Sequence, residues 1–212
     1  MVCIPPLAPE RPTRAQLDAR LDHVRQAPRD VGRLELIVRR PQVDGREVLA
    51  EGELSVEVGL VGDSWSQRPS SRTTDRRPHP DMQINVMSVR AAEAVAGPIK
   101  RWPLAGDQLF VDFDVSGANV PPGTRLAVGD AVLEVTAQPH TGCSKFAARF
   151  GADALAWVNA PEGRALNLRG INAKVVQAGR VRVGDVVRRL ADQSVVAASQ
   201  WRRVTACRCA NI

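Results

Sequence analysis

Short segments in which apolar and polar residues alternate recur along the chain from residue 32 onward, and turn-forming residues separate them. This pattern predicts β-strands that each bury one face. Strands are expected at residues 34–38, 54–60, 83–89, 108–113, 125–128, 131–136, 171–177 and 181–187. Short strands at such spacing favour a closed or nearly closed β-barrel over alternating βαβ units. Hairpin turns are expected at the Gly-containing dipeptides 129–130, 178–179 and 184–185.

Helical spacing of apolar residues is confined to a few segments. Residues 89–96 show it, and residues 144–159 show it on both sides of a break at Gly151. Near the N-terminus, Thr13 and Gln16 have the spacing of a helix N-cap and its reciprocal glutamine, and the helix that follows should lie on the domain surface. The predicted fold class is therefore mainly β (α+β), a β-barrel with a few peripheral helices.

The length of 212 residues is consistent with one domain that carries an extension at each end. Residues 1–30 are expected to form an N-terminal extension with a surface helix that ends near Pro28, residues 31–190 the domain, and residues 191–212 a C-terminal tail. No apolar run approaches the length of a membrane span, and no signal-peptide pattern precedes the domain. We expect a cytoplasmic protein that does not bind membranes.

The formal net charge of +6 raises the question of a nucleic-acid partner, because basic surfaces bind phosphate backbones. Aromatic residues make up only 4% of the chain and tyrosine is absent, which leaves little for base stacking. The composition favours a small anionic ligand, with a basic nucleic-acid-binding barrel as the weaker hypothesis. The polar segment 64–81 contains Arg72, Arg76 and Arg77, which either grip a phosphate or belong to a solvated basic loop.

Cys143 lies where a predicted strand gives way to a predicted helix, in the run Gln138-Pro139-His140-Thr141-Gly142-Cys143-Ser144-Lys145. Backbone amides at a helix start and the nearby cations Lys145 and Arg149 all favour a thiolate. These residues leave two interpretations of Cys143 equally open, a buried structural cysteine and a functional thiolate.

Several standard sites have no matching pattern in this sequence. The chain has three histidines, no Cys-x-x-Cys pair and no His-Glu-x-x-His motif, so a dedicated zinc site is not expected. Cys207 and Cys209 could bind a metal but stand without a nearby histidine. The scattered cysteines, Cys3 included, are expected to be reduced thiols. His140 is better placed to orient or tune Cys143 than to act as its base. The role that remains for Cys143 is that of a thiolate ligand to a soft metal that a cofactor carries.

Four blocks, taken in order, resemble the MOSC domain (molybdenum cofactor sulfurase C-terminal domain), in the form of its stand-alone bacterial members. They are Gly59-Leu60-Val61-Gly62-Asp63; Trp102-Pro103-Leu104-Ala105-Gly106-Asp107-Gln108-Leu109; Pro122-Gly123-Thr124-Arg125-Leu126-Ala127-Val128-Gly129 with Glu134-Val135 and Gly142-Cys143-Ser144-Lys145; and Arg169-Gly170-Ile171-Asn172-Ala173-Lys174-Val175-Val176 with Val183-Gly184-Asp185. The resemblance covers residues 31–190.

This resemblance implies a β-barrel that binds the molybdenum cofactor (Mo-molybdopterin) in a pocket at its rim. Cys143 matches the cysteine that coordinates the metal in such proteins and is the candidate catalytic residue and metal ligand. The candidate cofactor-binding residues are His140, Thr141, Gly142, Lys145, Arg149, Arg169, Arg72, Arg76, Arg77 and His79. Many members carry a His-Gly-Gly-Pro-like segment after the Gly-Asp block, whereas this chain has Arg76-Arg77-Pro78-His79-Pro80, so its pocket wall should differ.

The resemblance also implies two candidate functions. The first is an oxidoreductase that reduces small N-hydroxylated compounds, with electrons from a separate donor protein. The alternative is a non-catalytic cofactor carrier or sulfur-transfer module of the cofactor sulfurase kind. In that case a cysteine desulfurase would be a partner, and pyridoxal phosphate would belong to that partner, because this chain is too short to contain such a domain.

Overall fold

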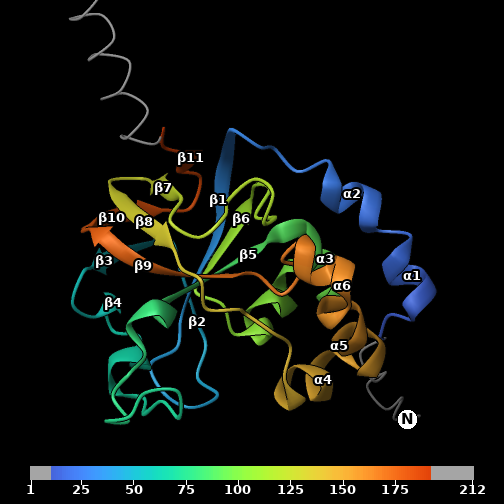
Figure 1. Ribbon diagram of the computed structural model, residues 1–212, viewed down its shortest axis with the longest axis horizontal. Coiled ribbons are helices and arrows are strands. Elements are labelled where there is room, and N and C mark those ends of the chain that lie inside the picture. The colour runs from blue at the N-terminus through green and yellow to red at the C-terminus, as the bar shows by residue number, and fades with distance from the viewer. Residues whose placement is uncertain (1–10, 192–212) are drawn as a thin grey trace, which may run out of the picture.

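The computed structural model describes residues 11–191 and places a β-barrel on one side of the molecule and helices on the other (Figure 1). The strands are β1 (Val31–Arg39), β2 (Glu47–Leu49), β3 (Glu51–Ser55), β4 (Gly59–Leu60), β5 (Ile84–Ser88), β6 (Leu109–Asp112), β7 (Arg125–Val128), β8 (Ala131–Val135), β9 (Ile171–Gln177), β10 (Gly179–Arg182) and β11 (Val186–Arg189). Helices and 3-10 turns are α1 (Arg14–Asp18), α2 (Leu21–Arg25), η1 (Ser64–Gln67), η2 (Pro80–Met82), α3 (Val89–Ala96), η3 (Ile99–Ala105), α4 (Ser144–Phe150), α5 (Ala152–Asn159) and α6 (Pro161–Ala165).

The barrel is closed, as the strand pattern predicts. Its strands follow the order β11-β7-β8-β9-β5-β6-β1, and pairing of β11 with β1 closes the ring. The β5–β6 pair is parallel and the other pairs in the ring are antiparallel, so the barrel is mixed. The strand β2 continues the sheet beyond β1, and β10, β3 and β4 form a separate small sheet. Closure removes the exposed edges that an open sheet would present.

Two of the three predicted hairpins are wrong. The turn at 129–130 does join the paired strands β7 and β8. After residue 178, however, β10 leaves the barrel and pairs with β3, and the turn at 184–185 itself bonds to β1 through Gly184 N–Leu34 O (2.7 Å) and Leu34 N–Asp185 O (2.9 Å). Pairing between distant segments therefore decides the topology here, and local turn residues do not reveal it.

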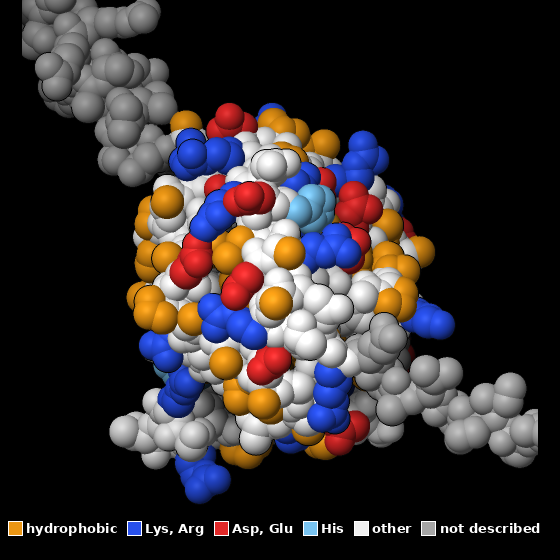
Figure 2. Space-filling view, turned by 90° about the vertical axis from the view of Figure 1, so that its right-hand side faces the viewer, with side chains coloured by type: hydrophobic (Ala, Val, Ile, Leu, Met, Phe, Trp, Pro, Cys, Tyr) orange, Lys and Arg blue, Asp and Glu red, His pale blue; other side chains and the backbone are white. Residues whose placement is uncertain are grey.

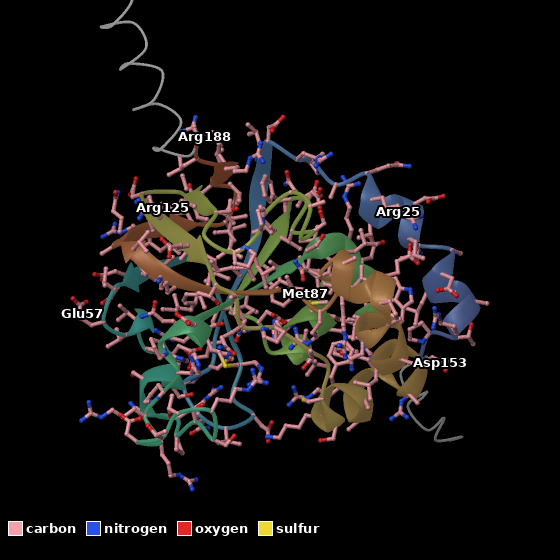
Figure 3. The ribbon with its side chains drawn as sticks, viewed as in Figure 1. Arg25, Glu57, Met87, Arg125, Asp153 and Arg188 are labelled. Atoms are coloured by element: carbon pink, nitrogen blue, oxygen red, sulfur yellow. The ribbon has the colours of Figure 1, made fainter. Side chains whose placement is uncertain are left out.

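Strand β1 contributes side chains to both apolar clusters of the molecule. Leu34 and Ile37 belong to the cluster inside the barrel, whereas Leu36 and Val38 belong to the cluster between the barrel and the helices. A register shift between Leu34 and Leu36 against β6 marks a bulge, which changes the face that successive residues present. Met87 of β5 also belongs to the second cluster and lies between strands and helices in Figure 3.

The predicted helices are confirmed with one change near the N-terminus. Helix α3 covers the predicted residues 89–96, and Gly151 separates α4 from α5. Thr13 and Gln16 form a reciprocal capping box, but two short helices, α1 and α2, replace the single one. The backbone N of Arg14 donates to Asp153 (3.0 Å; Asp153 is labelled in Figure 3), which attaches α1 to α5. Helix α6 and strand β2 were not among the predicted elements.

On the helical side of the surface, acidic and basic side chains are interspersed and apolar ones are scattered (Figure 2). No helix within residues 11–191 is long and apolar enough to cross a membrane. The predictions for Cys3, Cys207, Cys209 and nearly all of the C-terminal tail lie outside the described residues.

Candidate functional site

A pocket of about 310 Å³ lies where the ends of β1 and β5 meet η3 and the start of α4. Its volume is at the lower end of the range for small-molecule sites. Five arginines and a lysine contribute to the lining, together with one histidine and one cysteine. The lining residues are Arg40, Val43, Asp44, Arg46, Arg68, Asn85, Ala105, Gly106, His140, Cys143, Lys145, Phe146, Arg149 and Arg169.

Arg40, which follows β1, is held by a fully buried carboxylate. Its Nε and Nη2 donate to the two oxygens of Asp63 at 2.9 and 3.0 Å, and its Nη1 donates to Asn85 Oδ1 and to Gly106 O. The side chains of Arg40 and Asp63 are 6% and 0% exposed. Such a bidentate pair fixes the guanidinium geometry and leaves no buried charge uncompensated.

A chain of amides connects this pair to the segment that precedes Cys143. Asn85 Nδ2 donates to Asn172 Oδ1 at 2.6 Å, and Asn172 Nδ2 donates to Gln138 O at 3.0 Å. The side chains come from β5 and β9, which are neighbouring strands of the barrel. Buried and satisfied amide networks of this kind rigidify their surroundings.

Arg169 and Asp107 form a second buried pair beside the pocket. Arg169 Nη1 donates to Asp107 Oδ2 at 2.7 Å, Nη2 donates to Ala105 O at 2.8 Å, and the guanidinium lies 5.1 Å from the ring centre of Phe146. The residue after Arg169 must be glycine, because a Cβ on Gly170 would lie 2.4 Å from Val86 O and the backbone has φ +99°. The arginine is thus fixed from several sides.

His140 faces the same carboxyl group. Its Nδ1 lies 3.5 Å from Asp107 Oδ1, and neither of these buried atoms has a hydrogen-bond partner in the described structure. Burial, reinforced by the positive charges of Arg169, Arg40 and Arg72, lowers the pKa of His140 well below its usual value of 6.5. Burial also raises the pKa of Asp107, although Arg169 opposes this shift. The imidazole is therefore neutral at physiological pH.

Cys143 occupies the N-cap position of α4 without a side-chain capping bond, and it is exposed, so the structural alternative of a buried cysteine is wrong. The loop before it is held by Asn159 at the end of α5, whose side chain accepts from Gly142 N (2.9 Å) and donates to Gly142 O (3.1 Å). A Cβ on Gly142 would lie 2.8 Å from Leu155 and 2.9 Å from Val158. The fold thus presents a thiol on a rigid turn.

The remaining cations of the pocket lack buried carboxylate partners. Arg46 donates to Pro103 O and Gly45 O, and Arg68 donates twice to Ser64 Oγ. Lys145 is exposed at the pocket rim. Arg149 donates to Leu104 O at 2.8 Å and pairs with Asp44, whose side chain is 68% exposed. Positive charge therefore dominates this part of the pocket.

The sequence-predicted site residues fall into two groups. Cys143, His140, Lys145, Arg149 and Arg169 line one pocket. Thr141 and Gly142 lie in the loop directly before Cys143 and do not line the pocket. The remaining four do not line the pocket: Arg72 reaches Gln138 Oε1 (3.4 Å), Arg76 is exposed, Arg77 pairs with Asp75 (3.5 Å), and His79 Nδ1 accepts from Asp81 N (3.2 Å).

No sequence pattern identifies five residues that the structure places at or beside the pocket: Arg40, Arg46, Arg68, Asn85 and Asn159. The three arginines stand alone among many others, with no motif around them, so only tertiary contacts single them out. One signal was present in the blocks. Asp63, Asp107 and Asn172 are polar residues that lie next to apolar residues or glycine in these blocks, and all three are buried. Buried polar residues of this kind need partners, which here are Arg40, Arg169 and Asn85.

Comparison with known proteins agrees with this architecture. The family model for the MOSC domain matches residues 74–188, which is more than half of the 212-residue chain. The barrel itself begins earlier, with β1 at Val31. No significant match was found among curated proteins.

Solved structures share the fold at low sequence identity. A hypothetical protein is 17% identical with a TM-score of 0.54, over 80% of this chain and 71% of its own. The YUAD protein from Bacillus subtilis is 16% identical with a TM-score of 0.52, over 74% and 94%. YiiM from Escherichia coli is 20% identical with a TM-score of 0.50, over 76% and 70%. These likenesses support the fold alone, and the family model, together with the barrel and the four blocks, shows that the chain belongs to the MOSC domain family.

Proposed function

We propose that this protein binds a molybdenum cofactor in the pocket, with Cys143 as the protein ligand to the metal, and reduces small N-hydroxylated compounds. The observation that carries the proposal is the exposed Cys143 thiol on the lining of a cationic pocket. Soft metals favour thiolates, and phosphate groups favour arginine and lysine. Both preferences are met within one cavity.

The pocket residues fit such a cofactor by their chemistry. No group of three or more His, Cys, Asp or Glu side chains within residues 11–191 is arranged to hold a metal ion. In the proposal, Cys143 is therefore the one protein ligand to the metal, and the cofactor provides the other ligands. Arg169 Nε is a buried donor without a partner in the described structure, which normally costs about 1–3 kcal/mol. A heterocycle with nitrogen and oxygen acceptors would suit the donors of this wall.

Each side chain has a distinct role in the proposal. Cys143 would bind the metal, Lys145 and Arg149 would bind the cofactor phosphate, and Arg169 would contact the pterin. Such a cofactor supplies two-electron oxygen-atom transfer chemistry. Because His140 Nδ1 faces Asp107, Nε2 is the ring nitrogen left to hydrogen-bond a ligand. Asn159 fixes the turn that carries the thiol.

Reduction of an N-hydroxyl group consumes two electrons and two protons, yields an N–H group and releases the oxygen as water. The electrons would come from a separate redox protein, such as a flavoprotein or an iron–sulfur protein. To test the proposal, protein from a host that makes the cofactor is incubated with reduced viologen dye and benzamidoxime, and benzamidine is quantified. We expect turnover that Cys143→Ser abolishes and Arg180→Met, an exposed change on β10, leaves intact. Equal turnover by the wild-type and Cys143→Ser proteins would contradict the proposal.

A second function rests on the exposure of Cys143. An accessible thiol at a helix start can accept sulfur as a persulfide from a separate cysteine desulfurase, which would hold the pyridoxal phosphate. Incubation with a desulfurase and cysteine, followed by mass spectrometry, would show a sulfur-mass increment on the peptide that contains Cys143. Sulfur transfer without reductase turnover would favour the carrier function.

A further inference from the structure

The cations of the pocket differ in how their charge is compensated. Arg40 and Arg169 are buried and each contacts a buried carboxyl group, on Asp63 and Asp107. The guanidinium groups of Arg46 and Arg68 have only neutral acceptors, which are backbone carbonyls for Arg46 and the Ser64 hydroxyl for Arg68. Within residues 11–191 neither of these two contacts a carboxylate.

Arg46 and Arg68 are also close to other positive charges. Burial and the charges of Arg149, Arg40 and Arg68 lower the pKa of Arg46, and Asp44 opposes this shift only in part. Burial and the charge of Arg40 lower the pKa of Arg68, and Asp63, which is already paired with Arg40, opposes this shift only in part. Like charges that face one another in a partly desolvated pocket repel, and an anion between them removes the repulsion. The two side chains are therefore arranged to favour an anionic group.

The contacts that Arg46 and Arg68 already make would hold them in place for such a group. Arg46 uses Nε and Nη1, and Arg68 uses Nε and Nη2, so Arg46 Nη2 and Arg68 Nη1 remain without a partner in the described structure. Ser64 Oγ, which accepts from Arg68, itself donates to Arg40 O at 2.7 Å, and this ties the loop to the barrel. Guanidinium groups fixed in this way recognise carboxylate or phosphate oxygens.

We propose that Arg46 and Arg68 form a subsite for an anionic group, carboxylate or phosphate, on the substrate. This inference rests on the proposed function, because it assigns Lys145, Arg149 and Arg169 to the cofactor and leaves these two arginines for the substrate. They come from residues 46–68, ahead of the family-model match in the chain, whereas the proposed cofactor ligands come from residues 143–169. The preferred substrates are thus N-hydroxylated compounds that also carry a carboxylate or phosphate group.

The test compares benzamidoxime with 4-carboxybenzamidoxime as probes, by calorimetric binding to the molybdenum-containing protein. We expect the acidic probe to bind about tenfold more tightly to the wild type, the gain of one charge-assisted contact. The preference should fall to about twofold or less in Arg46→Met and Arg68→Met, recover in part in Arg46→Lys, and persist in Arg180→Met. Molybdenum and pterin contents should be equal in all five proteins.

Equal affinities of the two probes for the wild type would overturn the inference. Loss of molybdenum and pterin from Arg46→Met and Arg68→Met would also overturn it, because the two arginines would then hold the cofactor's own phosphate. If the wild type contains no molybdenum, the proposed function fails. The anion subsite is then tested separately, by calorimetric binding of inorganic phosphate to the metal-free protein and its variants. Phosphate binding that weakens in both methionine variants but not in Arg180→Met supports an anion subsite, and unchanged binding refutes it.

Discussion

The floor and the outer wall of the pocket use the same residue type in different ways. On the floor, Arg40 and Arg169 are buried against Asp63 and Asp107, and their contacts connect strands and loops of the barrel. On the wall, Arg46 and Arg68 are half-buried beside neutral acceptors and other cations. In this pocket the two buried ion pairs hold parts of the fold together, whereas the two arginines without a carboxylate partner are the ones that we propose to bind a ligand. Four measurements can break or sharpen that contrast.

The largest effect is expected for Asp63→Ala. This change leaves the guanidinium of Arg40 buried without its carboxylate, which typically costs about 3–5 kcal/mol of unfolding free energy. The exposed pair of Arg39 with Glu47 provides the control, and Glu47→Ala should cost no more than about 1 kcal/mol. Urea denaturation followed by circular dichroism measures both. Similar losses of unfolding free energy in Asp63→Ala and Glu47→Ala would show that the buried ion pair contributes no more to stability than an exposed one.

The next effect concerns the turn that carries the thiol. Asn159→Ala deletes both side-chain hydrogen bonds to the backbone of Gly142, and we expect a loss of about 1–3 kcal/mol in unfolding free energy. The turn should also loosen, so the alkylation rate of Cys143 by iodoacetamide, read by peptide mass spectrometry, should change. An unaltered rate in Asn159→Ala would mean that the thiol is positioned by other contacts.

A smaller effect is expected in the pH dependence of stability. The pKa of His140 is lowered in the folded protein, so below about pH 6.5 the unfolded chain takes up a proton that the folded one does not. Stability therefore falls as the pH decreases through that value, by up to about 1.4 kcal/mol per pH unit. His140→Gln should lack this component. Asp107, whose pKa is raised by burial, acts in the opposite direction. Parallel stability profiles from pH 7.5 to 5.5 would contradict a neutral His140.

The smallest effect on stability is expected for the outer wall. Arg46→Met and Arg68→Met each remove two hydrogen bonds to neutral acceptors but break no ion pair, so the unfolding free energy should fall by no more than about 1 kcal/mol. Relief of the repulsion from Arg40, and from Arg149 in the case of Arg46, offsets part of this loss. A loss as large as that of Asp63→Ala would show that these arginines are structural.

The sequence predicts much of the barrel because short apolar segments are separated by turn residues, and because its helices have clear breaks. Helix α3 and the division at Gly151 follow from local residues alone. Pairing of β10 with β3 joins residues far apart in the chain, which no local pattern encodes. The same holds for the pocket, because Arg40 and Asp63 are 23 residues apart and Arg169 and Asp107 are 62 apart. Cys143 could be found from sequence since its neighbours form a motif, whereas Arg46 and Arg68 have none.

The claim that the Cys143 pocket holds a molybdenum cofactor is tested most directly by the metal and pterin content of the purified protein. Wild type, Cys143→Ser and Arg180→Met are expressed side by side in a host that makes the cofactor and analysed by mass spectrometry for molybdenum and by fluorescence for oxidised pterin. We expect near-equal amounts of molybdenum and protein in the wild type and in Arg180→Met, and a loss of metal from Cys143→Ser. A wild-type protein without molybdenum, or a Cys143→Ser protein that retains it in full, would contradict the account.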